Sequence, residues 1–183
     1  VSFLPAILRR RLSKLDKGVL SVLKKAYTSN TQNIVFSSQY GEVERLVKLI
    51  NQYQEAKEVS PNLFSGSVHN YPIGFFLLDE KKTVPYTAIS SSEQSISSGL
   101  LTSVISEFEN ILYCYADVID DNVVAMAVNI SKNDNFSGKP FQIKLNKNSE
   151  ISDYFEDYVD LFEGRKSLLD TSIFRLEKVN YEK

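Results

Sequence analysis

The stretch Lys82–Leu100, which reads KTVPYTAISSSEQSISSGL, constrains this chain more than any other. A short β-forming run that starts at Pro85 stops at three serines, and a helical pattern begins directly after them. A strand, a tight turn of small residues and a helix make the geometry of a nucleophile elbow, which lifts one side chain above a sheet edge. The side chains at this bend are Ser92, Glu93 and Gln94, and none is a cysteine. Whether the bend is a catalytic site therefore depends on which further catalytic residues the rest of the chain contains.

Composition narrows the function classes. Lys and Arg number 21 against 23 Asp and Glu, so nothing suggests a nucleic-acid partner, and the basic cluster Arg9–Lys14 is interpreted as a solvated helix start. No apolar run approaches the roughly 20 residues that a membrane helix needs. The single Cys114 excludes an intrachain disulfide and suits a reducing cytoplasm. One His and one Cys cannot form a structural zinc site, and we expect neither a metal nor a cofactor.

The first part of the chain alternates helical and strand patterns. Apolar residues at helical spacing predict an amphipathic helix over Ser13–Tyr27, and Asn33–Ser38 reads as a short buried strand. A second helix opens at Tyr40-Gly41-Glu42. We expect its inner face to carry Val43, Leu46, Val47 and Ile50, and its solvent face to carry Glu42, Glu44, Arg45 and Lys48. This order indicates a parallel βαβ organisation.

The segment before the bend contains the chain's only histidine. Turn-forming residues predict a loop over Ser60–Asn70, and the apolar run Tyr71–Leu78 predicts a helix. As a catalytic base, His69 would need a nucleophile or a carboxylate held against it. We interpret it instead as a cap or a buried hydrogen-bonding residue at the start of that helix. After the bend the helix continues with an apolar face that meets a sheet: Ile96, Leu100, Leu101, Val104, Ile105 and Phe108.

The rest of the chain predicts a hairpin and further short elements. Ile111–Ala116 reads as a strand that stops at Asp117, with Cys114 as a small core residue, and Val123–Ile130 returns as its hairpin partner. A surface loop over 131–139 leads to an edge strand, Phe141–Leu145. A surface helix is predicted over 151–162. Residues 167–179 are ambiguous, with 173–176 as a candidate last strand. The absence of internal repeats favours a single domain.

Four pieces of the chain, in this order, resemble one family. They are Leu4-Pro-Ala-Ile-Leu-Arg-Arg-Arg-Leu-Ser13, Phe36-Ser-Ser-Gln-Tyr-Gly-Glu-Val-Glu44, Ser60-Pro with Ser67-Val-His-Asn70, and Pro85-Tyr-Thr-Ala-Ile89. Together they resemble the β-ketoacyl synthase-like N-terminal domain proteins, also called chain-length-factor-like proteins. These accompany bacterial clusters for aryl polyene and flexirubin-type lipids. The resemblance runs from about Leu4 to Asp117 and is loose beyond it.

The resemblance implies an α/β fold: the N-terminal half of a thiolase-like ketosynthase, with a mixed, mostly parallel sheet packed with helices. Residues 1–183 would form this single half domain. The usual first strand of the fold would lie before Val1, and the region after Asp117 would be rearranged.

The resemblance also implies that the bend is not a working nucleophile. In active ketosynthases, a cysteine after this strand takes the acyl chain. Counted from Pro85 and from Gly74, which match the proline and a glycine of the family pattern, that position falls on Glu93, with Gln94 beside it. A carboxylate is a weak acyl acceptor and would form a labile anhydride. The two histidines and the lysine of a condensing site come from the second half of the fold, so we expect no condensing activity from this chain.

The resemblance finally implies a dimer. In thiolase folds the strand before the bend pairs with its counterpart across a two-fold axis. Here the predicted dimer strand consists of Thr83, Val84, Pro85, Tyr86, Thr87, Ala88 and Ile89. Six residues are candidates for the bend and an acyl channel: Ser91, Ser92, Glu93, Gln94, His69 and Asn70.

Three hypotheses about function follow. In the first, the chain is a non-catalytic subunit of fatty acid, aryl polyene or polyketide-type biosynthesis. It would pair with a catalytic ketosynthase, help to shape the acyl channel and help to dock acyl carrier protein. The alternative is a homodimer that binds acyl carrier protein or an acyl chain. The third hypothesis, a serine hydrolase that uses Ser91 or Ser92 with His69, rests on the serines at the bend. Small residues that allow close packing explain them equally well.

Overall fold

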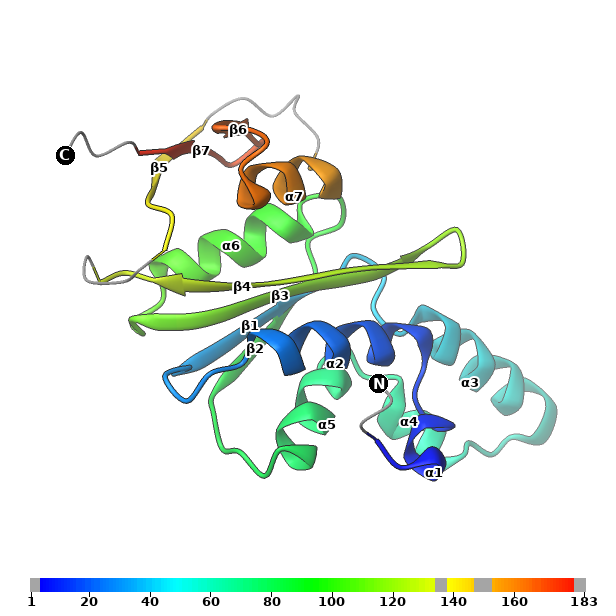
Figure 1. Cartoon of the computed structure of the whole chain (residues 1–183). Helices are drawn as coiled ribbons and strands as arrows, with labels where there is room; N and C mark the ends of the chain where they lie inside the picture. The colour runs from blue at the N-terminus through cyan, green and yellow to red at the C-terminus, as the bar shows by residue number, and fades with distance from the viewer. Residues whose placement is uncertain (1–3, 134–137, 147–152, 180–183) are drawn as a thin grey trace.

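The computed structural model describes residues 4–133, 138–146 and 153–179 of the chain. Its main sheet contains four strands, β1 (Asn33–Ser37), β2 (Tyr86–Ile89), β3 (Asn110–Ile119) and β4 (Asn122–Ser131), in the order β2-β1-β3-β4. Strand β1 runs parallel to β2 and to β3, whereas β4 is antiparallel to β3 (Figure 1). The predicted α/β class, a mixed and mostly parallel sheet packed with helices, is confirmed.

Helices α2 (Lys14–Ala26) and α5 (Tyr71–Asp79) cover one face of this sheet (Figure 1). Ser13 caps α2, because its Oγ accepts a hydrogen bond from the Asp16 backbone N at 2.9 Å. Alternate strand residues point to this face, so Phe36 and Cys114 belong to one buried cluster with residues of α2 and α5. Cys114 is fully buried, which confirms its prediction as a core residue.

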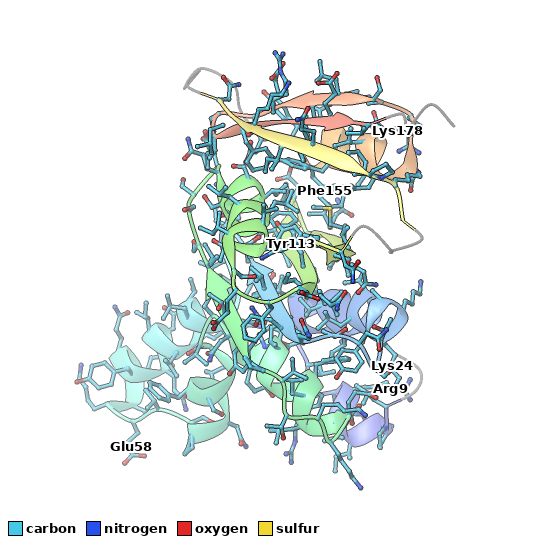
Figure 2. The ribbon with its side chains drawn as sticks, turned by 90° about the vertical axis from the view of Figure 1, so that its left-hand side faces the viewer. Arg9, Lys24, Glu58, Tyr113, Phe155 and Lys178 are labelled. Atoms are coloured by element: carbon cyan, nitrogen blue, oxygen red, sulfur yellow. The ribbon has the colours of Figure 1, made fainter. Side chains whose placement is uncertain are left out.

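The other face of the sheet is covered by α6 (Ser95–Ile105) and by a C-terminal unit. This unit contains β5 (Phe141–Leu145), α7 (Phe155–Glu163), β6 (Leu168–Asp170) and β7 (Phe174–Lys178), with its three strands antiparallel in the order β5-β7-β6. Tyr113 of β3, Tyr158 of α7 and Phe174 of β7 are all fully buried in one cluster. Figure 2 shows the unit stacked on α6, at the opposite end of the molecule from α1 and α3.

Several C-terminal predictions are confirmed or refined. Strand β5 lies at an edge of the small sheet, as its alternating pattern predicts. The ambiguous residues 167–179 contain two strands, β6 and β7, rather than one. Helix α7 begins at Phe155, later than predicted, and the first two residues of the predicted range lie outside the described residues.

Other element boundaries also differ from the predictions. The segment predicted as a loop contains α4 (Pro61–Gly66), which Ser60 caps and which has Pro61 in its first turn. Strand β2 begins at Tyr86, so the first three residues of the predicted dimer strand precede it. Strand β3 continues through Asp117 to Ile119. A short α1 (Ala6–Arg9) precedes α2. In the described part of the chain, no helix is long and apolar enough to cross a membrane.

Helix α3 (Val43–Ala56) does not bury the apolar face that the pattern predicts, although Glu44 and Lys48 are exposed as predicted. Three of its apolar side chains, Leu46, Val47 and Ile50, are 46%, 51% and 47% exposed, and Val43 is exposed as well. The residue that α3 buries is Arg45, and Glu42 directly before the helix is buried too, although the pattern places both at the solvent face. The pattern fails here because a charged side chain can be buried where an ion pair and hydrogen bonds satisfy it. Figure 1 shows α3 extending away from the sheet.

Candidate functional site

The predicted bend has the geometry of a strand, a tight turn and a helix. After β2 ends at Ile89, Ser92 adopts a left-handed backbone with φ of 51°, and α6 begins at Ser95. The Ser95 Oγ accepts from the Ser91 backbone N at 3.0 Å and donates to the Ser92 carbonyl at 2.7 Å. The Ser90 Oγ donates to the Gln39 carbonyl at 3.1 Å, which ties the bend to the loop after β1. The serines therefore build the turn through short local hydrogen bonds.

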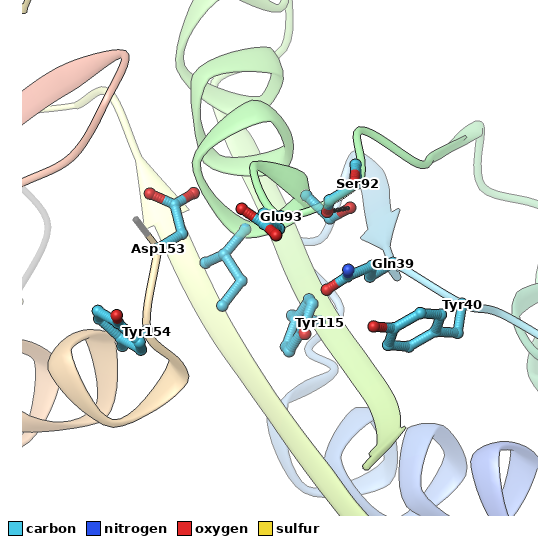
Figure 3. A pocket seen from close by; sticks show the side chains of 9 residues that line it. Gln39, Tyr40, Ser92, Glu93, Tyr115, Asp153 and Tyr154 are labelled. Carbon is cyan, nitrogen blue, oxygen red and sulfur yellow. Dashed lines mark hydrogen bonds between the residues drawn. The ribbon is translucent and has the colours of Figure 1, made fainter. Parts of the chain in front are cut away.

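A cleft of about 300 Å³ lies where the bend meets the loop after β1. The loop contributes Gln39 and Tyr40, the bend contributes Ser92 and Glu93, and the segment before α7 contributes Asp153 and Tyr154. Figure 3 shows Gln39 and Tyr40 on one side and Asp153 and Tyr154 on the other, with Glu93 and Tyr115 between them. The cleft lies beyond the carboxyl ends of the parallel strands β1 and β2, where open α/β sheets bind their ligands.

Only two of the six sequence candidates line this cleft, namely Ser92 and Glu93. Ser91 and Gln94 are exposed beside them. Glu93 is exposed as well, two residues before the first residue of α6. The position that the resemblance assigns to a nucleophile therefore carries a solvent-accessible carboxylate at the cleft.

His69 and Asn70 hold β2 rather than line the cleft. The His69 Nε2–H donates to the Ile89 carbonyl at 2.9 Å, and the ring contacts the Phe36 ring at a centroid distance of 5.4 Å. The Asn70 amide donates to the Tyr86 hydroxyl at 3.1 Å. Because a carbonyl only accepts, the proton of His69 is placed at Nε2. His69 is half-buried, so the hydrogen-bonding part of its prediction is confirmed and the full burial is not, and its Nε2 is not available as a base for the serines at the bend.

Two acidic residues that the sequence did not single out shape the cleft. Asp117 is fully buried near the carboxyl end of β3. It accepts hydrogen bonds from the Ser38 Oγ at 2.7 Å and from the backbone N of Gln39 and Tyr40 at 2.6 and 3.0 Å. It thereby fixes the loop that forms one wall. No local pattern marks Asp117 for this role, because its partners lie far away in sequence.

Asp153 lies at the amino end of α6. Its Oδ2 accepts from the Ser97 backbone N at 3.0 Å, in the first turn of the helix. Burial raises the pKa of this carboxyl, while the hydrogen bonds from Ser97 lower it. The free backbone N–H groups of a helix start favour an anion, so Asp153 already occupies part of this position. Among the described residues, no group of three or more His, Cys, Asp and Glu side chains is arranged to hold a metal ion.

The lone cysteine is expected to be inert in the folded chain. Cys114 is fully buried, and burial raises the pKa of its thiol, so little thiolate is present at neutral pH. Iodoacetamide should therefore label the folded chain at least about 100-fold more slowly than the urea-unfolded chain. Mass spectrometry of the intact chain measures this directly, because the chain has a single cysteine. Equal rates in the two states would contradict the prediction.

Comparison with known proteins places this arrangement in context. The sequence model of the β-ketoacyl synthase N-terminal domain matches residues 1–146. A chain in the structure of the ketosynthase ApeO in complex with its chain length factor ApeC, from Xenorhabdus doucetiae, is similar with a TM-score of 0.72 and 19% identity. That match covers 97% of this chain and 82% of that chain. No curated protein sequence matches the chain.

A second structure, the ishigamide ketosynthase/chain length factor, is similar with a TM-score of 0.57 and 9% identity. The match covers 74% of this chain and 49% of that chain, so this chain spans about half of that protein's length. At these identities, the two structures support the thiolase-like ketosynthase fold and not a shared activity.

Proposed function

This chain belongs to the family of β-ketoacyl synthase N-terminal domains, and from that membership we propose that it is a chain-length-factor-like subunit without condensing activity. It would pair with a catalytic β-ketoacyl synthase in aryl polyene, polyketide-type or fatty acid biosynthesis. Both similar structures contain ketosynthases with chain length factors, which supports a partner of this kind. A role for acyl carrier protein as a further partner stays a prediction.

The observation that carries this proposal is Glu93 at the cleft. The residue-by-residue resemblance aligns it with the acyl-accepting cysteine, and its carboxylate lies at the amino end of α6 beside Ser92. A carboxylate at this position does not form a thioester. The chain retains the architecture of a nucleophile elbow, while the residue at its tip lacks the required chemistry.

The free edge of β2 supports the proposed pairing. Within the described ranges, strand β2 is the last strand on its side of the main sheet and pairs only with β1. In the parallel ladder, the Pro85 carbonyl accepts from the Ile34 N and the Ile89 carbonyl accepts from the Ser38 N. The alternation of such a ladder turns the N–H and C=O groups of Ala88 away from β1. An unpaired edge of this kind is a template for another strand, and the side chain of Thr87 is exposed beside it.

The cleft supports a role in shaping an acyl channel. Its volume of about 300 Å³ is at the lower end of small-molecule sites. Its apolar surface comes from Ile96, Tyr40 and Tyr115. The side of the cleft at the amino end of α6 is acidic, because Glu93 and Asp153 lie there. We propose that the partner completes the channel at this side of the molecule.

A Thr87→Lys variant is expected to weaken binding to the ketosynthase at least about tenfold. A lysine on an edge strand opposes strand addition and places an unpaired charge in the proposed interface. The exposed side chain should leave the fold intact. The measurement is co-purification of the tagged chain with a ketosynthase encoded beside it, followed by light scattering of the complex. Gln142→Lys, an exposed change on the separate β5 strand, is the matched control.

The outcomes separate the alternatives. Loss of the complex with Thr87→Lys and its retention with Gln142→Lys would support pairing through the edge of β2. A stable homodimer that binds none of the ketosynthases encoded beside it would support a module that binds an acyl chain or acyl carrier protein instead. A monomer that binds none of them would overturn the proposal.

A further inference from the structure

Arg45 connects helix α3 to several other parts of the molecule. Arg45 is the residue that α3 buries, while Val43, Leu46, Val47 and Ile50 of the same helix are exposed. The Arg45 Nη2 donates to the Asp16 Oδ2 at 2.6 Å and to the Arg11 carbonyl at 2.8 Å, and its Nη1 donates to the Gly66 carbonyl at 2.7 Å. The guanidinium also lies 5.0 Å from the centre of the Tyr71 ring. One side chain therefore joins α3 to α2, to the segment after α1, to α4 and to α5.

A second carboxylate completes the cluster. The Glu42 Oε2 lies 3.4 Å from the Arg45 Nε, and its Oε1 accepts from the Ser13 Oγ at 2.7 Å. Asp16 is fully buried, and Glu42 is 5% exposed. Two carboxylates thus share one guanidinium in a site nearly closed to water. We propose that this cluster is a protonation-sensitive latch that docks the α3–α4 arm, residues 42–66, onto the body of the molecule.

The charge balance gives the latch its sensitivity. Ionisation of both carboxyls leaves one uncompensated negative charge in a buried site, which is costly. Burial and the neighbouring Asp16 raise the pKa of Glu42 to about 7, and the hydrogen bond from Ser13 and the charge of Arg45 oppose the rise. Glu42 is therefore the group that takes up a proton near neutral pH.

The surrounding charged groups do not supply the missing positive charge. Across a groove of about 210 Å³ beside Glu42 lie Glu44 and the ion pair of Lys14 with Asp121, whose atoms are 2.7 Å apart. The Asp121 carboxylate raises the pKa of Lys14, so this cation is already paired. On the far side, Tyr71 is a neutral phenol whose pKa burial raises. His69 lies against Gly41, and its Nε2–H is bonded to the Ile89 carbonyl.

The direction of the pH effect follows from the raised pKa of Glu42. When the arm opens, Glu42 leaves the buried site, and its carboxyl ionises near its usual pKa of 4.5, whereas in the docked arm it ionises near 7. The latch is therefore strongest at low pH, weakens as the pH rises between these two values, and changes little above about pH 7. Between pH 5.5 and 8.5 the opening equilibrium of the arm should rise roughly 30-fold.

The latch also reaches the cleft. Glu42 directly follows the loop of Gln39, Tyr40 and Gly41, and the first two of these residues line the cleft beside Glu93. Asp117 holds the start of this loop, and the latch holds its end. Opening of the arm would release one of the two anchors of this wall.

The test is hydrogen exchange of α3 peptides at pH 5.5 and 8.5, corrected for the intrinsic rates. We expect the roughly 30-fold rise in opening for the wild-type chain and a rise of at most about 3-fold for Glu42→Gln, which keeps an acceptor for Ser13 but does not ionise. Glu44→Gln, on the same helix and exposed, is the matched control and should keep the wild-type response. An equal response in wild type and Glu42→Gln would overturn the proposal.

A second measurement needs no variant. The side-chain carboxyl of Glu42 can be titrated by carbon NMR in the folded wild-type chain. A midpoint near pH 7 supports the latch, and a midpoint at or below pH 4.5 overturns it.

Discussion

An Arg45→Met variant is expected to lose about 3–5 kcal/mol of unfolding free energy at pH 8, because it leaves Asp16 and Glu42 buried without their shared cation. Methionine keeps much of the length of the arginine stem, so the change removes charge and hydrogen bonds more than volume. The carbonyls of Arg11 and Gly66 lose their donors at the same time. Urea unfolding followed by circular dichroism measures the effect.

The loss should shrink at lower pH. Arg45 lowers the pKa of Glu42, so the pKa of Glu42 rises further when Arg45 is removed, and protonation then relieves one of the two stranded charges. Arg175→Met is the matched control, because Arg175 pairs with Asp170 on the outer face of the small sheet and should give no comparable loss. A destabilisation by Arg45→Met below about 1 kcal/mol would show that the cluster does not hold the arm.

A Gly99→Ala variant is expected to lower the unfolding free energy by about 3 kcal/mol through overpacking. A Cβ added at Gly99 would lie 2.5 Å from a ring carbon of Tyr113 and 2.7 and 3.0 Å from the Oγ and Cβ of Ser37. Both neighbours are fully buried, and their hydroxyls are joined by a hydrogen bond of 2.8 Å. Helix α6 would have to move away from β1 and β3, which would also shift the bend.

Gly74→Ala is the matched control for Gly99→Ala. Gly74 also lies inside a helix, α5, but a Cβ there would meet only the Tyr86 hydroxyl, at an ordinary contact distance of 3.7 Å. Replacing a helical glycine by alanine in open space should stabilise the chain by about 0.5–1 kcal/mol. Thermal unfolding of both variants gives the comparison. Equal shifts of the two melting temperatures would be inconsistent with close packing at Gly99.

The sequence predicts the main sheet and the bend because both rest on local patterns. Helix α2, the central strands and the hairpin of β3 with β4 follow from hydrophobic periodicity and turn residues. The strand, serine turn and helix around Ser92 are found where predicted. These elements bury most of the side chains that their patterns mark as apolar, but Ile105, predicted on the sheet-facing side of α6, is 72% exposed because it lies at the last residue of the helix.

The sequence fails where partners distant in the chain decide the outcome. Helix α3 has an apolar stripe, yet the residue it buries is Arg45, which forms an ion pair with Asp16 on α2. Asp153 reaches the amino end of α6 and Asp117 reaches the loop after β1, and both contacts join segments that no local pattern connects. Polar contacts between distant segments carry no periodicity, so most of the cleft wall could not be predicted.

The pairing of β1 has a consequence for the order of folding. Its register joins Ile34 to Tyr86 on one side and Asn33 to Ile111 on the other, whereas β3 and β4 join through a tight turn. Loop closure makes both of these distant pairings slower than the hairpin, so we expect β3 and β4 to form early and β1 and β2 to join them later. The edge proposed for the partner strand would then be completed only after the hairpin has formed.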